Sequence, residues 1–114
     1  MLPKLNRLTQ EKDVKRVMTK GRAFFVKEFG IKSIRKQSNL LSKVGIIVPK
    51  KIARTAVLRN RIKRQVRHIF LKRIDQIQPG YDIVFMARPD FLKLKFDEME
   101  EKIISVLKRV KLLS

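Results

Sequence analysis

Apolar residues near the N-terminus recur at the spacing of a short helix. Val14, Val17 and Met18 fall on one face when the chain is wound at about 3.6 residues per turn. Thr9 stands where an N-cap is expected, because its hydroxyl can accept a hydrogen bond from the first turn. The pattern predicts a first helix over residues 10–20.

From residue 22 to residue 34 the pattern changes to a period near two. Phe25, Phe29 and Ile31 alternate with charged positions, which is typical of a strand. The polar segment 35–42 that follows is typical of a hairpin loop. We therefore expect one strand here and a hairpin to the next.

Two short segments rich in β-branched residues predict further strands. The first, residues 44–48, is apolar enough for a central strand and ends at Pro49. The second, residues 82–87, follows Pro79 and Gly80, which suit the central positions of a type II turn.

Two amphipathic segments predict longer helices. The stronger covers residues 56–76, and its apolar residues share one face: Leu58, Ile62, Val66, Ile69 and Phe70. The second is C-terminal, and Asp97 and Glu100 have the spacing of a capping pair at its start. The element order is helix, two or three strands, helix, strand, helix, which favours an α/β sandwich.

The composition points to a polyanionic partner. The 114 residues suit one domain, and 44% of them are apolar, enough for one modest core. Lysine and arginine number 29 against 10 acidic residues, a formal net charge of +19. Such a field concentrates polyanions, of which nucleic acid is the commonest and an anionic membrane the alternative.

Cysteine is absent from the sequence. Disulfides, thiolate metal sites and thiol nucleophiles are therefore excluded, and a reducing compartment is compatible with the chain. The first residues lack the apolar core of a signal peptide, and no run of residues reaches membrane-spanning length. We expect a soluble cytoplasmic protein without a membrane partner.

The basic residues are concentrated in a stretch without acids. Between Phe29 and Ile74 lie 46 positions with fourteen lysines and arginines and no aspartate or glutamate, and ten of the fourteen fall between Lys50 and Arg73. Helix surfaces usually mix both signs, because like charges one turn apart repel. The uncompensated repulsion indicates that an external anion supplies the missing charge; a merely solubilising helix face is the less favoured interpretation.

Helical spacing separates a packing face from a binding face in this stretch. At about 100° per residue, the apolar side chains occupy a third of the circumference of the predicted helix 56–76. Arg59 falls inside the apolar arc, so we expect it in an irregular entry turn. The candidate RNA-contacting residues are Lys50, Lys51, Arg54, Arg59, Asn60, Arg61, Lys63, Arg64 and Arg67.

The segment A-V-L-R-N-R-I-K-R at residues 56–64 resembles the arginine-asparagine-arginine signature of bacterial ribonuclease P proteins. Residues 48–51, 80–82 and 87–88 are similar to family patterns as well, as is Arg7-Leu8 before the first helix. The resemblance extends over nearly the whole chain.

The resemblance implies a fold and a set of roles. The fold would be of the α+β class, a two-layer α/β sandwich of order α-β-β-β-α-β-α with a left-handed β-α-β crossover, like the second domain of a small-subunit ribosomal protein. Residues 1–114 would form a single RNA-binding domain. The signature would face the catalytic RNA subunit of ribonuclease P, one per chain, and the complex would remove the 5′ leader of precursor tRNA.

The resemblance also implies a cleft for the leader, between the first helix and the sheet. The family often has aromatic residues there, whereas this chain offers Val14 and Met18, so we expect charge, for example from Lys32, to contribute more. Three phenylalanines could replace the missing rings, although core packing is expected for at least two of them: Phe24, Phe25 and Phe29.

No catalytic or metal-binding set is predicted in the protein. The single histidine, His68, lies inside the basic helix, where a surface or RNA-contact role outweighs a general base. Four of the acids cluster at a helix start and suit its dipole better than metal ligation: Asp97, Glu98, Glu100 and Glu101. We expect the RNA and its Mg²⁺ to perform the cleavage and the chain alone to be inactive.

Other classes explain less of the sequence. A ribosomal or ribosome-assembly protein would account for charge, size and fold but not for the signature. A DNA-binding helix-turn-helix protein would need a second helix joined by a glycine-type turn to the basic one. A protein nuclease would cleave without an RNA subunit, and a membrane-surface helix would not be surrounded by strands.

Overall fold

The computed structural model describes residues 7–8, 10–36 and 42–113. The elements, in chain order, are α1 Glu11–Lys20, β1 Arg22–Phe25, β2 Phe29–Arg35, β3 Lys43–Ile47, α2 Ala56–Leu71, β4 Tyr81–Ala87, the short 3-10 helix η2 Pro89–Lys93 and α3 Phe96–Arg109. The predicted α-β-β-β-α-β-α order of an α+β protein is confirmed, with η2 as an addition.

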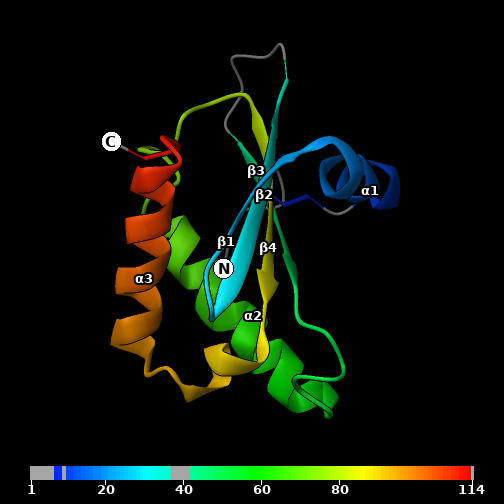
Figure 1. Ribbon diagram of the computed structural model, residues 1–114, viewed down its shortest axis with the longest axis vertical. Coiled ribbons are helices and arrows are strands. Elements are labelled where there is room, and N and C mark those ends of the chain that lie inside the picture. Colours follow the sequence, from blue (N-terminus) through cyan, green and yellow to red (C-terminus); the bar gives the residue numbers. More distant parts are fainter. Residues whose placement is uncertain (1–6, 9, 37–41, 114) are drawn as a thin grey trace.

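The sheet has the strand order β1-β2-β4-β3. β4 lies between β2, to which it is antiparallel, and β3, to which it is parallel. α2 and α3 pack on one face of the sheet, and α1 lies on the opposite face (Figure 1). β3, α2 and β4 thus form the parallel β-α-β unit that the resemblance implies; the left-handed sense of its crossover stays a prediction.

Two predictions about the first strands are wrong. Residues 22–34 form two antiparallel strands, because the chain turns at Lys27 and Glu28 and the Val26 amide donates to the Phe29 carbonyl at 2.9 Å. β2 and β3, the strands before and after the predicted hairpin loop, do not pair with each other, since β4 lies between them. Part of that connection, residues 37–41, lies outside the described residues.

β3 is an edge strand of the sheet rather than the predicted central one. Its free side is covered by the segment before α1, where Arg7 bridges Val44 and the Leu8 amide donates to the Val44 carbonyl at 3.0 Å. Gly45 permits this approach, because a Cβ there would lie 3.2 Å from the Leu8 carbonyl oxygen. The apolar character of β3 thus reflects cover from a distant segment.

The helix ends differ from the predicted ones by up to five residues. α2 stops at Leu71 instead of residue 76, and the following turns bury Ile74 and Ile77 in the core. α3 is capped at Lys95, whose amide donates to Glu98 Oε1 at 2.9 Å, so the predicted Asp97–Glu100 capping pair is wrong. In the described part of the chain, no helix has both the length and the apolar character needed to span a membrane.

At the start of α1 the N-cap position belongs to Gln10, whose side chain makes no capping hydrogen bond. The predicted cap residue, Thr9, lies outside the described residues. The predicted type II turn is supported by Gly80, whose φ of 83° is open to glycine and strained for other residues.

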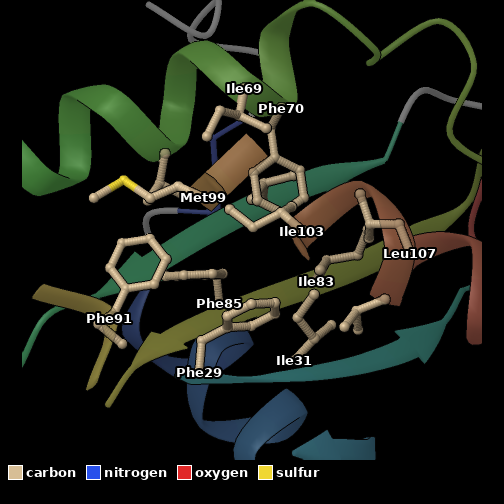
Figure 2. Packing of buried hydrophobic residues seen from close by; sticks show 14 of the residues in the cluster. Phe29, Ile31, Ile69, Phe70, Ile83, Phe85, Phe91, Met99, Ile103 and Leu107 are labelled. Carbon is tan, nitrogen blue, oxygen red and sulfur yellow. The ribbon is translucent and has the colours of Figure 1, made fainter. Parts of the chain in front are cut away.

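The main core lies between the sheet and the α2–α3 layer (Figure 2). Phe85 of β4 is at its centre and fully buried, with its ring centroid 5.1 Å from that of Phe29 and 5.3 Å from that of Phe91. Phe70 of α2 meets Phe85 edge-on at 6.4 Å. This aromatic packing holds α2 against the sheet and so determines which side of the helix faces outward.

Candidate RNA-binding surface

α2 is positioned by its cap and its apolar face. The Thr55 hydroxyl oxygen accepts a hydrogen bond from the Leu58 amide at 3.1 Å, which begins the helix. Ile62, Val66 and Ile69 are buried against the sheet, as the apolar periodicity predicts. The polar side of the helix must therefore face outward.

The structure brings the predicted signature residues together on α2 and on the segment that enters it. We call this group the α2 basic surface. Lys63 and Arg67 are half-buried at its margin, Arg59 is half-buried beneath it, and the others are exposed. The α2 basic surface consists of Lys50, Lys51, Arg54, Arg59, Asn60, Arg61, Lys63, Arg64 and Arg67.

The cations of this surface have no acidic partners in the described part of the chain. None of them is within 4.0 Å of a carboxylate there, whereas Lys72 and Arg73, just after the C-terminal end of α2, lie 3.3 Å and 3.5 Å from Glu100. The first turn of α2 also lacks acids. The repulsion inferred from the sequence is thus present in the folded protein, and a polyanion would relieve it.

Arg67, a member of this surface, lies near enough to Arg7 of the N-terminal segment for their positive charges to repel. Burial of its guanidinium, together with the positive charge of Arg7, lowers the pKa of Arg67 from its ordinary value. Arg7 lies beside β3 on the edge away from β4, where its backbone forms a parallel bridge with Val44. In the sequence Arg7 stands out only as part of the Arg7-Leu8 pattern, because the covering of β3 by this segment depends on tertiary structure.

Arg59 has a different setting from the other members. The irregular entry turn expected for it is wrong, since α2 is regular from Ala56 onward. The side chain instead turns back, and its Nη1 donates to the carbonyl oxygens of Ala53 and Arg54 at 2.9 Å and 3.1 Å. Arg59 therefore braces the segment that presents the exposed cations.

The residues predicted to contact the leader, Val14, Met18 and Lys32, also lie close together in the structure. Lys32 Nζ donates to the Met18 carbonyl at 2.8 Å and ties the end of α1 to the sheet. Val14 and Met18 are half-buried against a small cluster that includes Val84. We call the meeting place of Val14, Met18 and Lys32 the α1–sheet junction.

The three phenylalanines that could replace the missing aromatic residues of the leader cleft differ in burial. Phe29 is fully buried in the main core, and Phe24 packs against that core beneath the guanidinium of Arg109, 5.5 Å from the ring centroid. These two confirm the prediction that at least two of the three are core residues. Phe25 is 51% exposed and points to the α1 side of the sheet.

The acids and the histidine form no recognisable catalytic group. His68 is exposed on α2, with its ring 6.0 Å from that of Phe96. Asp97 and Glu98 lie in the first turn of α3, where its dipole favours acids. Across residues 7–8, 10–36 and 42–113, no three acidic or histidine side chains gather in a way that could hold a metal ion.

The chain is similar to known proteins over nearly its whole length. The model of the ribonuclease P family matches residues 2–111. The ribonuclease P protein component of a Pseudanabaena species is 32% identical over 113 residues, 99% of this chain and 97% of that protein. That of Clostridioides difficile is 35% identical over 103 residues, 90% of this chain and 89% of that protein.

Solved structures agree with the sequence matches. The ribonuclease P protein of Staphylococcus aureus superposes with a TM-score of 0.88 at 28% identity, over 97% of this chain and 100% of that one. That of Thermotoga maritima gives a TM-score of 0.79 at 30% identity, over 90% and 96%. Because one family model, sequence relatives and fold all agree over the same residues, the chain belongs to the ribonuclease P protein component family.

Proposed function

We propose that the α2 basic surface binds the RNA subunit of ribonuclease P and that the α1–sheet junction lies along the path of the 5′ leader of precursor tRNA. Family membership makes the chain the protein subunit of this ribonucleoprotein endoribonuclease. The observation that supports the assignment of the α2 basic surface is that its cations have no carboxylate partners among the described residues.

The chemistry of the α2 basic surface suits a folded RNA. Arginine forks bind phosphate oxygens through two parallel hydrogen bonds, and the exposed amide of Asn60 can contact a sugar hydroxyl or a base edge. A rigid helix holds these groups at fixed spacing, so binding costs little conformational entropy beyond that of the side chains. The surface then screens repulsion between RNA phosphates.

The protein's part in the reaction is positioning rather than bond cleavage. A protein that cleaves a phosphodiester with Mg²⁺ must hold the metal ions with several converging oxygen ligands. Most of the acids that the structure describes lie in the first turns of helices or in ion pairs such as Lys27–Asp90 and Lys102–Glu28. We therefore assign the catalytic Mg²⁺ to the RNA subunit and expect the chain alone to be inactive.

The α1–sheet junction offers a mixed apolar and cationic path. Val14 and Met18 supply apolar contact from α1, and Lys32 places a positive charge where the helix ends. A single-stranded leader would find both phosphate attraction and base contact there. We propose one RNA subunit per chain, precursor tRNA as substrate, and a cytoplasmic location, where precursor tRNA is processed in bacteria.

The direct test is cleavage of precursor tRNA at low Mg²⁺ by the chain alone, by a bacterial ribonuclease P RNA alone, and by both together. We expect strong cleavage only from the combination, because the protein lowers the Mg²⁺ requirement of the RNA. Absence of stimulation across several RNA types would contradict the proposal. Cleavage by the purified chain alone would move catalysis to the protein.

Alanine substitutions at two signature arginines should have different effects, one on stability and the other on RNA affinity. Arg59→Ala should lower the free energy of unfolding by about 1–2 kcal/mol, because it removes charged hydrogen bonds to two carbonyls. Arg61→Ala should leave unfolding unchanged and weaken affinity for the RNA subunit about tenfold, since Arg61 is exposed.

Chemical denaturation and filter binding would separate these effects. The control is Lys108→Ala on the exposed side of α3, which should change neither quantity appreciably. If all three variants weakened RNA binding equally, bulk charge rather than the signature would account for the interaction.

A further inference from the structure

We propose that Phe25 is a stacking platform for one base of the bound leader, in place of the aromatic residues missing from α1. This inference rests on the proposed leader path and extends it to the end of β1. In the sequence Phe25 is one of three phenylalanines that could replace the missing rings. The structure distinguishes the three by burial.

The first support is the exposure of the ring. Of the phenylalanines, all of which the structure describes, Phe25 alone is more than half exposed, at 51%. Phe24 and Phe29, its neighbours in sequence, both pack on the main core. An exposed ring contributes little to folding, whereas an aromatic face presented to single-stranded RNA stacks on bases of any sequence.

The second support is the backbone of Gly30, against which the Phe25 ring packs. Phe25 is opposite Gly30 in the β1–β2 register. A Cβ added to Gly30 would collide with Cδ1 and Cε1 of the Phe25 ring, so the ring covers the bare backbone of that glycine. One side of the ring is thereby held against the sheet. A ring restrained in this way loses little side-chain entropy when a base stacks on it.

The third support is continuity with the α1–sheet junction. Gly30 is also opposite Met86 in β4, and the Met86 methyl group would lie 3.4 Å from a Cβ at Gly30. Met86 in turn packs against the small cluster that Val14 and Met18 join. Apolar surface therefore runs from α1 across β4 and β2 to Phe25. Lys32 is two residues along β2 from Gly30 and faces the same side.

The fourth support is the charge beside the ring. The Arg88 guanidinium carbon lies over Phe25, 5.9 Å from the ring centroid. Arg88 Nη1 donates to the Val26 carbonyl at 3.1 Å, which holds the cation in place. Phe25 is still 51% exposed with the guanidinium over its ring, so a base can stack on the uncovered part of the ring while the cation binds the phosphate of that nucleotide. An apolar protein partner would leave Arg88 without an anion.

The test uses the holoenzyme reconstituted with a bacterial ribonuclease P RNA and precursor tRNAs with a long leader or a single-nucleotide leader. Phe25→Ala should weaken binding of the long-leader substrate about five- to tenfold, the lower part of the range for stacking of one base on an aromatic ring. It should leave the single-nucleotide-leader substrate unaffected. Phe25→Tyr should bind as the wild type does.

An abasic scan of the leader identifies the contacted base. At one position, removal of the base should weaken wild-type binding as much as Phe25→Ala does, and should cause no further loss in that variant. Arg88→Ala should weaken binding equally with and without that base, because its partner is a phosphate. Gly30→Ala should reproduce the loss by displacing the ring.

The outcomes distinguish this inference from the proposed function. If the wild type stimulates cleavage but Phe25→Ala binds long leaders normally, or loses affinity equally for both leaders, the stacking role is wrong while the subunit role stands. If the wild-type protein stimulates no cleavage, the proposed function itself fails. Circular dichroism and thermal unfolding should show that each variant is fully folded at the temperature of the binding assay.

Discussion

Replacing Arg54, Arg61 and Arg64 together by alanine should weaken affinity for the ribonuclease P RNA at least about 100-fold. All three side chains are exposed on the α2 basic surface, and none has a carboxylate partner among the described residues. Each substitution removes a charge-assisted contact to a phosphate and, with it, the release of a counterion from the RNA. The slope of log affinity against log salt should therefore fall by about two to three.

A matched control removes the same charge from another face. Lys93, Lys102 and Lys108 are exposed around η2 and α3, so their joint replacement by alanine lowers the net charge equally. That variant should bind the RNA subunit within a few-fold of the wild type and keep its salt slope. Equal losses from both triple variants, measured by filter binding over a salt series, would show that charge alone determines binding.

Replacing Phe85 by alanine should lower the free energy of unfolding by about 3–5 kcal/mol. The side chain is fully buried between Phe29, Phe70 and Phe91, so its loss leaves a cavity that the sheet and α2 cannot close. Urea unfolding followed by circular dichroism measures the effect. RNA affinity should fall only as far as the folded fraction does.

The control for this prediction is a phenylalanine on the other side of the same sheet. Phe25→Ala removes a ring that is half exposed, so it should cost less than about 1 kcal/mol. Similar costs for the two substitutions would contradict the assignment of Phe85 to the core and of Phe25 to an exposed position on the other face.

Several features followed from the sequence because they depend on neighbouring residues. The apolar repeat from Leu58 to Phe70 predicted the buried face of α2, and the acid-free stretch predicted a surface of uncompensated cations. Pro79 and Gly80 predicted a turn that the φ of Gly80 supports. The signature predicted the family, which the comparisons then showed over residues 2–111.

Strand pairing could not be read from local pattern. β3 has the composition of a central strand but lies at the edge, since a segment distant in sequence covers its free side. The turn at Lys27 and Glu28 lacks glycine and proline, so the hairpin of β1 and β2 resembled one strand. Pairing is decided by long-range hydrogen bonds and burial, which short-range periodicity does not record.

The roles of side chains likewise separate into those that the sequence determines and those that depend on the tertiary structure. By itself the sequence determined that this protein has amphipathic helices, one apolar core and a basic surface on its longest helix, because charge and periodicity are properties of residue order. Only the tertiary structure decided that Arg59 braces the entry to α2 and that Phe25, not Phe24 or Phe29, keeps an exposed ring. Those outcomes depend on which groups the fold places within a few ångströms, and residues adjacent in the chain point to opposite faces of a sheet.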